Sequence, residues 1–432
     1  MIEILEEQEK KAACLLVGAP NKNNEEPKEL IGLVDTLGML CVKTVVLSRI
    51  EVTPAYGIGT GKAHEIASLA KECFADCIIF DWEISASKQR NWEKLTGINV
   101  FDRNEVIIRI FARRAKTKEA ALQVQLAQLN YSLPRLSHMY GDLARQRGGN
   151  YGSKGSGETQ LELDRRQIED KILQIKKELA QVSVNRQIQR KQRLRTATSS
   201  CALVGYTNAG KSSLLNALTG ADAFVENRLF ATLDPTTRKF SISEASQVLL
   251  TDTVGFISNL PHTLIDAFRS TLEEANLSDL LLIVVDSSDE NCVNQYEQVL
   301  KVLEEIGAEK IPSLVVLNKI DKIKDDFVAM SNLDSHFPNA VKVSARTNEG
   351  FETLVEKMSE NLLGKLSEYI VPLSRPDLVE IVRKNGTIED EQWLEDGVHL
   401  IARIPGTVDE SGKCSTKTLS LLNQYFQSYI EN

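Results

Sequence analysis

The octapeptide at 205–212, GYTNAGKS, constrains the fold of this chain more than any other stretch. It fits the pattern G-x-x-x-x-G-K-[ST], in which a glycine-rich loop wraps phosphate groups with its backbone amides. Glycines allow the close approach, the N-terminus of a following helix adds partial positive charge, and Lys211 adds a full charge. The apolar run 200–204 precedes the loop, and the helix-forming run 213–218 follows it. A phosphate-binding loop between a buried strand and a helix predicts an α/β domain.

Three further motifs follow the loop in order, each at the end of an apolar run. Residues 252–255, DTVG, match D-x-x-G, whose carboxylate holds Mg²⁺ through water and whose glycine amide reaches the terminal phosphate. Residues 318–321, NKID, match N-K-x-D, whose carboxylate accepts hydrogen bonds from guanine N1–H and the exocyclic amine, a pairing that adenine cannot offer. The backbone of 344–346 is then expected to meet guanine O6. The ordered set predicts a guanine-nucleotide site and argues against an ATP-specific kinase.

A switch segment is expected to complete the Mg²⁺ shell beside the Ser212 hydroxyl when a triphosphate is bound. The candidates lie in 229–238, LFATLDPTTR, where we choose Thr232 and keep Thr236 and Thr237 as alternatives. The predicted metal ligands are therefore Ser212 and Thr232. The predicted nucleotide contacts are Gly205, Tyr206, Thr207, Asn208, Ala209, Gly210, Lys211, Ser212, Phe230, Ala231, Thr232, Leu233, Asp234, Asp252, Thr253, Val254, Gly255, Asn318, Lys319, Ile320, Asp321, Ser344, Ala345 and Arg346.

The residue after D-x-x-G is Phe256, at the position where Ras-like enzymes place a water-orienting glutamine. Because phenylalanine cannot hydrogen-bond water, slow intrinsic hydrolysis is expected, with help from a partner, a backbone group or a cation. Two interpretations of Asn208 stay open: it holds K⁺, as potassium-stimulated GTPases do at this position, or it only fixes the loop. The predicted catalytic residues are Lys211, Asn208 and Gly255.

Composition indicates an ordinary soluble globular protein of two to four domains, with 432 residues, 42% hydrophobic and 26% charged. Seven cysteines are scattered without zinc or redox spacing, as buried thiols in a reducing cytosol would be. The acidic start, MIEILEE, lacks the layout of a signal peptide, and no apolar run approaches the ~20 residues of a membrane span. We expect a cytoplasmic monomer without stable membrane insertion.

The net charge of −9 hides an asymmetry. Residues 101–200 carry 20 Lys and Arg against 10 Asp and Glu, a balance of +10, so the remainder, with 31 against 50, carries −19. Such a basic block indicates either a polyanion partner or a solvated helical face. Its loop 145–157, RQRGGNYGSKGSG, is basic and rich in glycine, and either contacts folded RNA or serves as a linker. The candidate RNA-binding residues are Arg145, Arg147, Tyr151 and Lys154.

Apolar periodicity predicts alternating strands and helices before residue 100 and long helices after it. The expected strands are 12–17, 44–47 and 77–80, and the expected helices are 27–39, 62–73 and 85–95. The glycine-rich loop 57–62 either only turns into its helix or also contacts an anion. Two apolar stripes predict a pair of long helices that pack on each other. The stripes consist of Leu122, Leu126, Leu129 and Leu133, and of Leu161, Ile168, Ile172, Ile175, Leu179 and Val182.

The predicted fold class is α/β. Its parts are an N-terminal α/β domain (1–104), a long helical hairpin with a basic glycine-rich loop (105–195), a P-loop G domain with a mostly parallel sheet flanked by helices (196–366), and a small C-terminal α+β domain (367–432). In the last part we expect strand-like runs at 379–382 and 398–404 and a terminal helix near 416–430.

Several runs resemble the HflX family of ribosome-associated GTPases. They are 205–212, 229–238, 252–257, 268–274 (FRSTLEE), 155–162 (GSGETQLE), 122–129 and 133–136. The likeness covers nearly the whole chain and is weakest before residue 50 and after residue 370. The run 213–216, SLLN, departs from the usual Thr-Leu-Phe-Asn, and 101–105, FDRNE, departs from the usual Asp-Arg-Thr.

The resemblance implies the same domain order and GTP hydrolysis stimulated by the large (50S) ribosomal subunit. It also implies GTP-dependent splitting of stalled ribosomes, with the hairpin loop near the peptidyl-transferase region and its rRNA, and a link between the N-terminal domain and ATP. Two alternatives remain: an RNA-binding protein, GTP-regulated or with the G domain only as a scaffold, and a G protein that regulates another protein without RNA.

Overall fold

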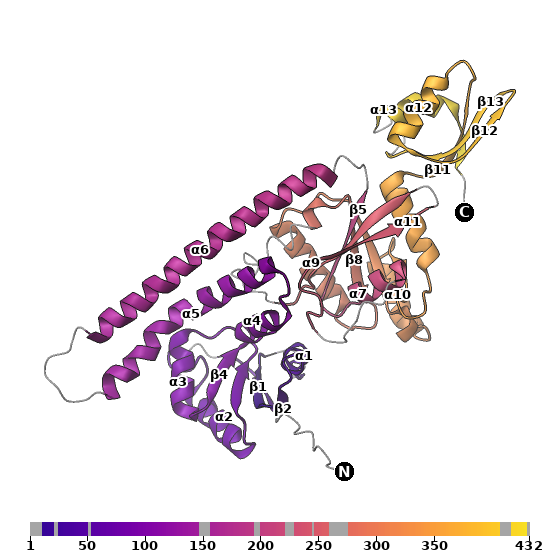
Figure 1. The fold of residues 1–432 in the computed structure, drawn as a ribbon. Helices are drawn as coiled ribbons and strands as arrows, with labels where there is room; N and C mark the ends of the chain where they lie inside the picture. The colour runs from indigo at the N-terminus through magenta and orange to yellow at the C-terminus, as the bar shows by residue number, and fades with distance from the viewer. Residues whose placement is uncertain are drawn as a thin grey trace, which may run out of the picture. The chain divides into compact units, whose positions relative to one another are not determined.

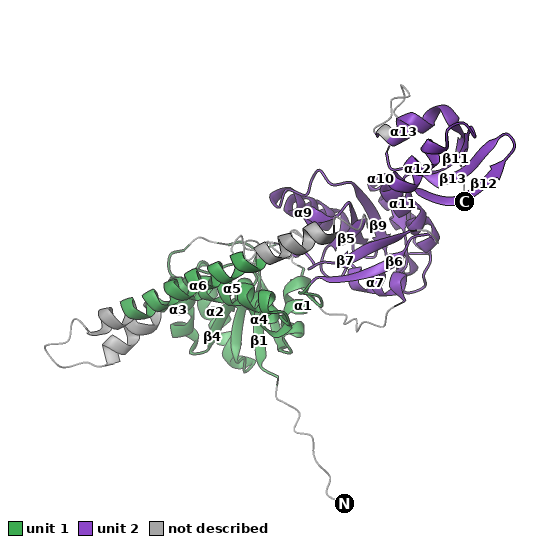
Figure 2. Cartoon of the chain, turned by 45° about the horizontal axis from the view of Figure 1, so that its top comes forward, with its two compact units in different colours: residues 1–188, 226–234, 259–269 green, residues 189–225, 235–258, 270–432 purple. Residues whose placement is uncertain are grey.

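The computed structural model describes residues 11–20, 25–50, 53–146, 156–193, 199–220, 229–243, 246–258, 275–406 and 416–429. The chain divides into two compact units (Figure 2). The first comprises 1–188 with 226–234 and 259–269, and the second comprises the remainder.

A four-stranded parallel sheet forms the centre of the first unit, in the order β2-β1-β3-β4. Its strands are β1 (Ala13–Gly18), β2 (Leu40–Val46), β3 (Cys77–Phe80) and β4 (Asn99–Asp102). The connecting helices are α1 (Lys28–Thr36), α2 (Thr60–Glu72) and α3 (Ala86–Thr96), followed by α4 (Arg103–Arg114). Parallel neighbours require such crossovers, because a tight turn joins only antiparallel strands. The expected strands and helices are confirmed, while the four-residue strand β4 was not predicted.

Two long helices, α5 (Lys118–Gln146) and α6 (Ser156–Arg193), lie side by side (Figures 1 and 2). Leu126, Ile172 and Ile175 form the buried centre of their contact. Leu122, Leu129, Leu133, Ile168 and Leu179 pack around it. The predicted pairing of the two apolar stripes is therefore confirmed.

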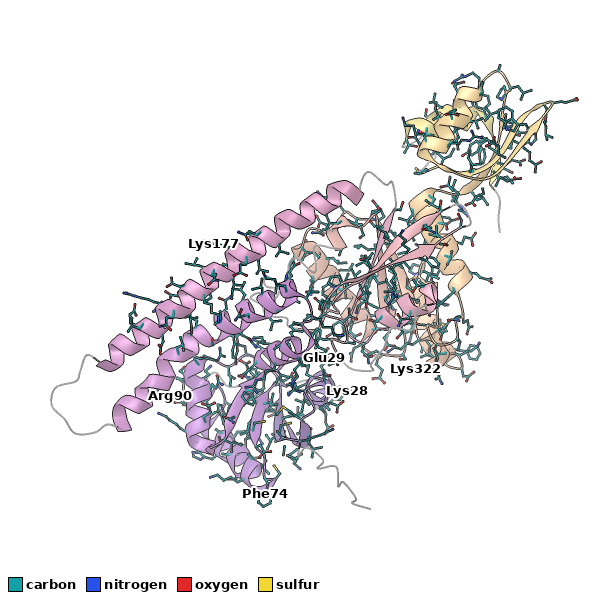
Figure 3. The ribbon with its side chains drawn as sticks, viewed as in Figure 1. Lys28, Glu29, Phe74, Arg90, Lys177 and Lys322 are labelled. Atoms are coloured by element: carbon teal, nitrogen blue, oxygen red, sulfur yellow. The ribbon has the colours of Figure 1, made fainter. Side chains whose placement is uncertain are left out.

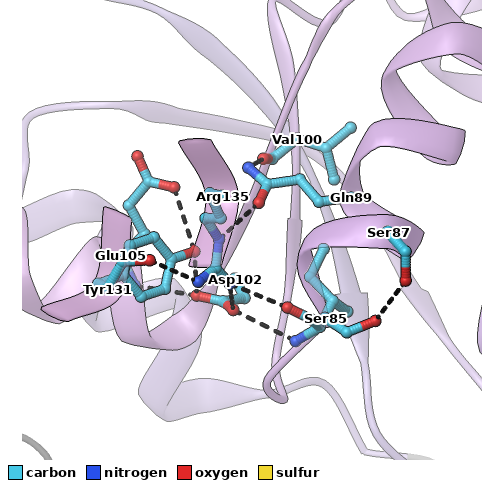
Figure 4. Close-up of polar contacts among 9 residues, drawn as sticks. Ser85, Ser87, Gln89, Val100, Asp102, Glu105, Tyr131 and Arg135 are labelled. Atoms are coloured by element: carbon cyan, nitrogen blue, oxygen red, sulfur yellow. Dashed lines mark hydrogen bonds and ion pairs between the residues drawn. The ribbon is translucent and has the colours of Figure 1, made fainter. Parts of the chain in front are cut away.

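A buried polar network attaches α5 to the sheet (Figure 4). Asp102, at the end of β4, is fully buried and accepts hydrogen bonds from Glu105 N (3.0 Å), Ile84 N (3.2 Å) and the Tyr131 hydroxyl (3.0 Å). The Arg135 guanidinium adds an ion pair to Asp102 at 3.3 Å and lies over the Tyr131 ring, 3.5 Å from its centroid. Burial raises the pKa values of Asp102 and Tyr131. The run 101–105, which departs from the family pattern, thus forms an N-cap and an anchor for the hairpin.

On the other side of the same junction, Arg103 is buried and pairs with Asp81 at 2.8 Å and with Glu29 of α1. Figure 3 marks Glu29 on α1. Burial disfavours the charged guanidinium, but the two carboxylates outweigh it and raise the pKa of Arg103. The ion pairs tie α1 and the end of β3 to the start of α4.

The second unit contains a six-stranded sheet in the order β10-β9-β8-β5-β7-β6. Among its described strands, β6 runs antiparallel to β7 and the other pairings are parallel. The strands are β5 (Ser200–Gly205), β6 (Thr236–Ser241), β7 (Gln247–Asp252), β8 (Leu280–Asp286), β9 (Ser313–Asn318) and β10 (Val341–Lys342). The helices are α7 (Lys211–Thr219), η2 (Ala275–Leu277), α9 (Cys292–Glu305), η3 (Ile320–Lys322), α10 (Phe327–His336) and α11 (Phe351–Leu363). The predicted mostly parallel P-loop sheet is confirmed.

The C-terminal part forms an antiparallel sheet in the order β12-β13-β11-β14. Its elements are β11 (Leu366–Val371), α12 (Pro376–Asn385), β12 (Thr387–Leu394), β13 (Gly397–Arg403), α13 (Lys417–Leu422), η4 (Asn423–Tyr425) and β14 (Phe426–Tyr429). The expected mixture of helices and antiparallel strands is confirmed.

Two local expectations in this part were wrong. Residues 379–382, expected as strand-like, lie in α12, where Leu378, Val379 and Val382 bury one helical face and Pro376 starts the helix. The terminal helix expected near 416–430 ends at Leu422, and the chain continues as η4 and β14, whose strand pairs with β11. The backbone groups of β14 are satisfied by pairing with β11. This long-range pairing could not be predicted from the helical periodicity of the sequence.

Candidate functional site

The phosphate-binding loop joins the end of β5 to α7 and depends on two glycines. Gly205 has φ +150°, and a β-carbon there would lie 2.3 Å from Val284 O. Gly210 has φ +94°, and a β-carbon there would lie 2.3 Å from Asn318 Nδ2. Both positions therefore exclude a side chain by close approach as well as by backbone conformation. The first amides of a helix have no intrahelical acceptor, so those at the start of α7 are suited to bind an anion.

Lys211 is 6% exposed, and its ammonium donates to Gly205 O at 3.1 Å and Tyr206 O at 2.8 Å. Burial lowers the pKa of Lys211 to about 8, although Asp252 raises it. A β-carbon at Gly255 would lie 2.9 Å from Lys211 Nζ, so the D-x-x-G glycine and the P-loop lysine adjoin. The structure thus brings two of the predicted catalytic residues together.

A hydroxyl and a carboxylate that could bind a metal lie together beside the phosphate-binding loop. The Ser212 hydroxyl donates to Asp252 Oδ2 at 2.6 Å, and Asp252 is 2% exposed. Thr253 turns away and donates to Leu203 O at 2.7 Å. A hydroxyl beside a buried carboxylate fits a hard divalent cation, because Mg²⁺ in nucleotide sites takes one or two protein oxygens together with phosphates and water. Within the described residues, no cluster of three His, Cys, Asp or Glu side chains could hold a metal by itself.

The N-K-x-D motif is hydrogen-bonded to the phosphate-binding loop. Asn318 donates to Ala209 O at 2.9 Å and accepts from Ala345 N at 3.0 Å, so one side chain joins the P-loop, β9 and the 344–346 segment. Ser344 donates to Asp321 Oδ1 at 2.7 Å, which fixes the carboxylate. The predicted residues of both guanine-contacting segments therefore lie together around Asn318.

Lys319 also connects the N-K-x-D motif to the phosphate-binding loop. Its backbone is left-handed, with φ +66°, and its ammonium reaches Asn208 O at 2.7 Å and Asp286 Oδ2 at 2.6 Å. Asp286 was missing from the predicted site, although its place at the end of the apolar strand β8 was a usable signal. Asn208, with φ +61°, is held through its carbonyl, so its exposed side chain is not needed for this contact.

Phe256 lies where a water-orienting residue would be sought, and its side chain is 2% exposed. Its amide donates to Gly205 O at 3.1 Å, and its carbonyl accepts from Thr207 N at 2.6 Å. The Tyr206 hydroxyl accepts from Ser258 N at 2.6 Å, which adds a further hydrogen bond between the phosphate-binding loop and the segment after D-x-x-G. The ring is thus part of the packed interior, as its apolar character favours, and it supplies no polar group to water.

The 229–234 run clusters with the first unit. Phe230 and Leu233 are each 2% exposed, and Asp234 accepts from Lys116 N at 3.0 Å and Thr117 N at 3.2 Å. The predicted role of Thr232 at Mg²⁺ is untested by these contacts and stays a prediction.

Of the four candidate RNA-binding residues, only Arg145 falls within a described element. Arg145 belongs to the last turn of α5, but its side chain is outside the described atoms. Arg147, Tyr151 and Lys154 lie outside the described residues altogether. Along the parts of the chain that the structure describes, no helix is both long and apolar enough to cross a membrane.

Three family models match successive parts of the chain. They are described as GTP-binding GTPase N-terminal (24–112), GTP-binding GTPase Middle Region (114–193) and 50S ribosome-binding GTPase (200–319). Together they match well over half of the chain.

Curated relatives match along nearly the full length. A protein named GTPase HflX from Akkermansia muciniphila is 43% identical and covers 94% of this chain and 97% of its own length. Another GTPase HflX, from Escherichia coli K12, is 40% identical, with 89% and 91% covered. Among solved structures, a chain titled "crystal structure of SsGBP and GDP complex" is 28% identical, with a TM-score of 0.47, and covers 81% of this chain and 98% of its own.

Proposed function

This chain belongs to the HflX family of GTPases and hydrolyses GTP, and we propose that it does so on the large ribosomal subunit to split or rescue stalled ribosomes. The ribosomal part of this proposal draws on the match to a family described as 50S ribosome-binding GTPase and on the basic block around the hairpin. The geometry of the nucleotide site adds a reason why such a partner would be needed.

In the proposed mechanism, the P-loop amides and Lys211 bind the β- and γ-phosphates, and Asp321 selects guanine. Ser212 and Thr232 would ligate Mg²⁺, with Asp252 acting through water. The cation would neutralise charge on the phosphates during transfer to water. The Gly255 amide holds the γ-phosphate. Each of these groups acts by position and charge, which is the dominant contribution in phosphoryl transfer.

The observation that carries the need for a partner is the burial of Phe256. Its ring is packed and its backbone is paired with the P-loop at Gly205 and Thr207. Without a polar side chain here, orientation of the attacking water falls to a backbone group, to K⁺ held at Asn208, or to the ribosome. Slow intrinsic hydrolysis and strong stimulation by a bound partner follow from this arrangement.

The proposed partner contact is the hairpin end, with Arg145, Arg147, Tyr151 and Lys154 against rRNA. Arginine and lysine neutralise phosphates, and tyrosine stacks on exposed bases. We further propose that the protein acts as a monomer in the cytoplasm, where ribosomes are present.

The decisive assay measures GTP hydrolysis with and without purified 50S subunits, together with co-sedimentation under a non-hydrolysable GTP analogue or GDP. We expect strong stimulation, since a trans-acting partner can contribute about 10³- to 10⁵-fold in other GTPases, and binding that prefers the analogue. Equal, weak association with both nucleotides would contradict a nucleotide switch. Stimulation without dissociation of 70S ribosomes would favour a GTP-regulated RNA-binding protein instead. Equal rates in K⁺ and Na⁺ would remove the cation role of Asn208.

The chain offers a matched control for the hairpin. The double variant Arg145→Ala/Arg147→Ala is expected to lose 50S binding while keeping GTP affinity. Arg165→Ala/Arg166→Ala removes the same charge from the exposed face of α6, where the two arginines pair with Glu169 and Glu162. If both double variants lose binding equally, general charge rather than the hairpin end carries the interaction.

A further inference from the structure

The turn that follows β8, residues 286–289 with the sequence DSSD, has no part in the proposed nucleotide chemistry. Strand β8 pairs in parallel with β9, and the pairing places Asp286 opposite Asn318, the first residue of the N-K-x-D motif. Ser287 is 5% exposed, and both its amide (3.0 Å) and its hydroxyl (2.6 Å) donate to Asn318 O. The end of β8 is therefore hydrogen-bonded to the start of the N-K-x-D motif.

Both carboxylate oxygens of Asp286 have defined partners. Oδ1 accepts from the amide of Ser288 at 3.0 Å and from the Ser288 hydroxyl at 2.6 Å. Oδ2 accepts from the Lys319 ammonium at 2.6 Å, and the side chains of Asp286 and Lys319 are only 15% and 20% exposed. The contacts with Ser288 orient the carboxylate, and the low exposure makes its ion pair stronger than one in open water.

Lys319 extends this attachment to the phosphate-binding loop. Its ammonium also donates to Asn208 O at 2.7 Å, so one cation joins the end of β8 to the loop. The backbone of Lys319 is left-handed, with φ +66°, a conformation that residues with a β-carbon keep where their surroundings hold them. Asp321 follows two residues later in η3, so the direction of this turn helps to set where the Asp321 carboxylate lies.

Holding a lysine side chain in one conformation removes rotamer freedom. With Asp286 present, this loss is met when the chain folds. Without the carboxylate, Asn208 O is a neutral and weaker acceptor for the ammonium. Ordering of Lys319 and of its turn would then fall on nucleotide binding, which lowers affinity.

We propose that Asp286 is a positioning residue for the nucleotide site, and that through Lys319 it fixes the N-K-x-D turn against the phosphate-binding loop before the nucleotide binds. The proposal rests on the assignment of Asp321 to guanine under the proposed function. Loss of Asp286 should weaken the binding of GDP and GTP by the same factor, because the contacts involve the loop and the base motif. It should also reduce the preference for guanine, because Asp321 is no longer held in place.

The test measures dissociation constants of the full-length protein for GDP, a non-hydrolysable GTP analogue and inosine diphosphate. The base of inosine diphosphate lacks the exocyclic amine, so the preference for GDP over it reports how well Asp321 meets that amine. Asp286→Asn should weaken GDP and analogue binding each by about 10-fold, the lower end for a hydrogen bond to a charged group. The same variant should narrow the preference for GDP over inosine diphosphate.

Asp289→Asn is the matched control in the same turn. The Asp289 carboxylate accepts from Asn291 N and from Gln295 Nε2, both at 2.9 Å, around the start of α9. This variant should leave all three dissociation constants unchanged.

A double-mutant cycle with Lys319→Met tests the route of the effect. In the Lys319→Met background, Asp286→Asn should cause little further loss of GDP affinity, because both changes remove the same ion pair. An equal loss in both backgrounds would show that Asp286 does not act through Lys319, and would overturn the proposal.

The preference for GDP over inosine diphosphate is the decisive readout, because a general loosening of the fold weakens both ligands alike. An unchanged preference in Asp286→Asn, with normal folding by circular dichroism, overturns the proposal. If Asp286→Asn does not fold, Ser288→Ala decides, because it removes the hydroxyl that orients the carboxylate and keeps the ion pair. It should weaken GDP binding by about 3-fold and narrow the preference, and wild-type values for both would contradict the positioning role.

Asp321→Ala separates the two levels of inference. If this variant keeps the preference for GDP over inosine diphosphate, the guanine assignment fails and the positioning role fails with it. If Asp321→Ala removes the preference while Asp286→Asn leaves it unchanged, only the positioning role fails.

Discussion

Lys211 shows how one residue carries opposing requirements. A phosphate ligand needs its positive charge, but burial lowers the pKa of Lys211 to about 8. Below pH 8 the fold carries a charged, desolvated ammonium held by the carbonyls of Gly205 and Tyr206. This burial opposes folding, and the opposition weakens as pH rises from about 8 towards the ordinary lysine value of 10.5. Bound phosphates favour the charged form, so nucleotide binding should raise the pKa again.

Proton uptake on nucleotide binding follows at the residue scale. At pH 8.5 a good part of free Lys211 is neutral, so binding GDP or GTP should take up a fraction of a proton. Calorimetry in two buffers of different ionisation enthalpy measures this uptake directly. At pH 6.5 the lysine is already charged in both states, and its contribution should vanish. Equal proton uptake at the two pH values would contradict the lowered pKa.

At the scale of elements, the contact between α5 and the sheet of the first unit is held by polar groups as well as by apolar packing. Arg135 is the hub: it donates to Gln89 Oε1 (2.8 Å), Tyr131 O (2.9 Å) and Ile84 O (2.9 Å), besides pairing with Asp102. A planar guanidinium satisfies several acceptors at fixed angles, which an ammonium cannot do. The direction of α5 should therefore depend on this one side chain.

Arg135→Lys should lower the free energy of unfolding by about 2–4 kcal/mol, because buried acceptors lose their donor and Asp102 loses part of its compensation. Arg109→Lys is the matched control. Arg109 also lies over an aromatic ring, that of Phe101 at 4.1 Å, and pairs with Glu105, but its side chain is 48% exposed. Its replacement should cost below about 1 kcal/mol. Urea denaturation measures both, and similar losses would show that Arg135 is not a special anchor.

At the scale of the whole molecule, charge is distributed unevenly along the chain. The +10 balance of residues 101–200 stands within an acidic protein. Such a distribution favours approach of one region to a polyanion while the rest of the surface is repelled. Binding to rRNA through this region should therefore be orientation-selective as well as sensitive to ionic strength.

Salt dependence tests this directly. With about four phosphate contacts, affinity for 50S subunits should fall about 100-fold between 50 and 200 mM salt, because counterions are released on binding. Nucleotide affinity, governed by a buried site, should change far less over the same range. Measuring the dissociation constants for 50S subunits and for nucleotide on one preparation provides the internal control. A flat salt profile for 50S binding would favour a protein partner over rRNA.

The sequence was sufficient for the parts of the site that depend on local chemistry. Gly205, Gly210, Lys211, Asn318 and their motifs were predicted because phosphate and guanine recognition demands those residue types in fixed order after apolar strands. The parallel sheet and the paired hairpin helices followed from apolar periodicity. The wrong expectations, at 379–382 and 416–430, concern a small domain where short apolar runs fit a helix or a strand equally well.

Long-range contacts were decided only by the tertiary structure. Nothing in the local pattern showed that Asp234 would meet Thr117, that Arg135 would reach Asp102, or that Lys319 would join Asp286. Such contacts depend on how distant elements pack, and a single chain's periodicity reports only which face of each element is apolar. The sequence by itself determined that the residue types of a guanine-nucleotide site stand in fixed order after apolar strands, because the ligand's chemistry dictates those types. Only the tertiary structure showed which contacts hold residues 229–234 and the buried Lys211 in place. The burial of a side chain and the partners it reaches are set only once the elements have packed.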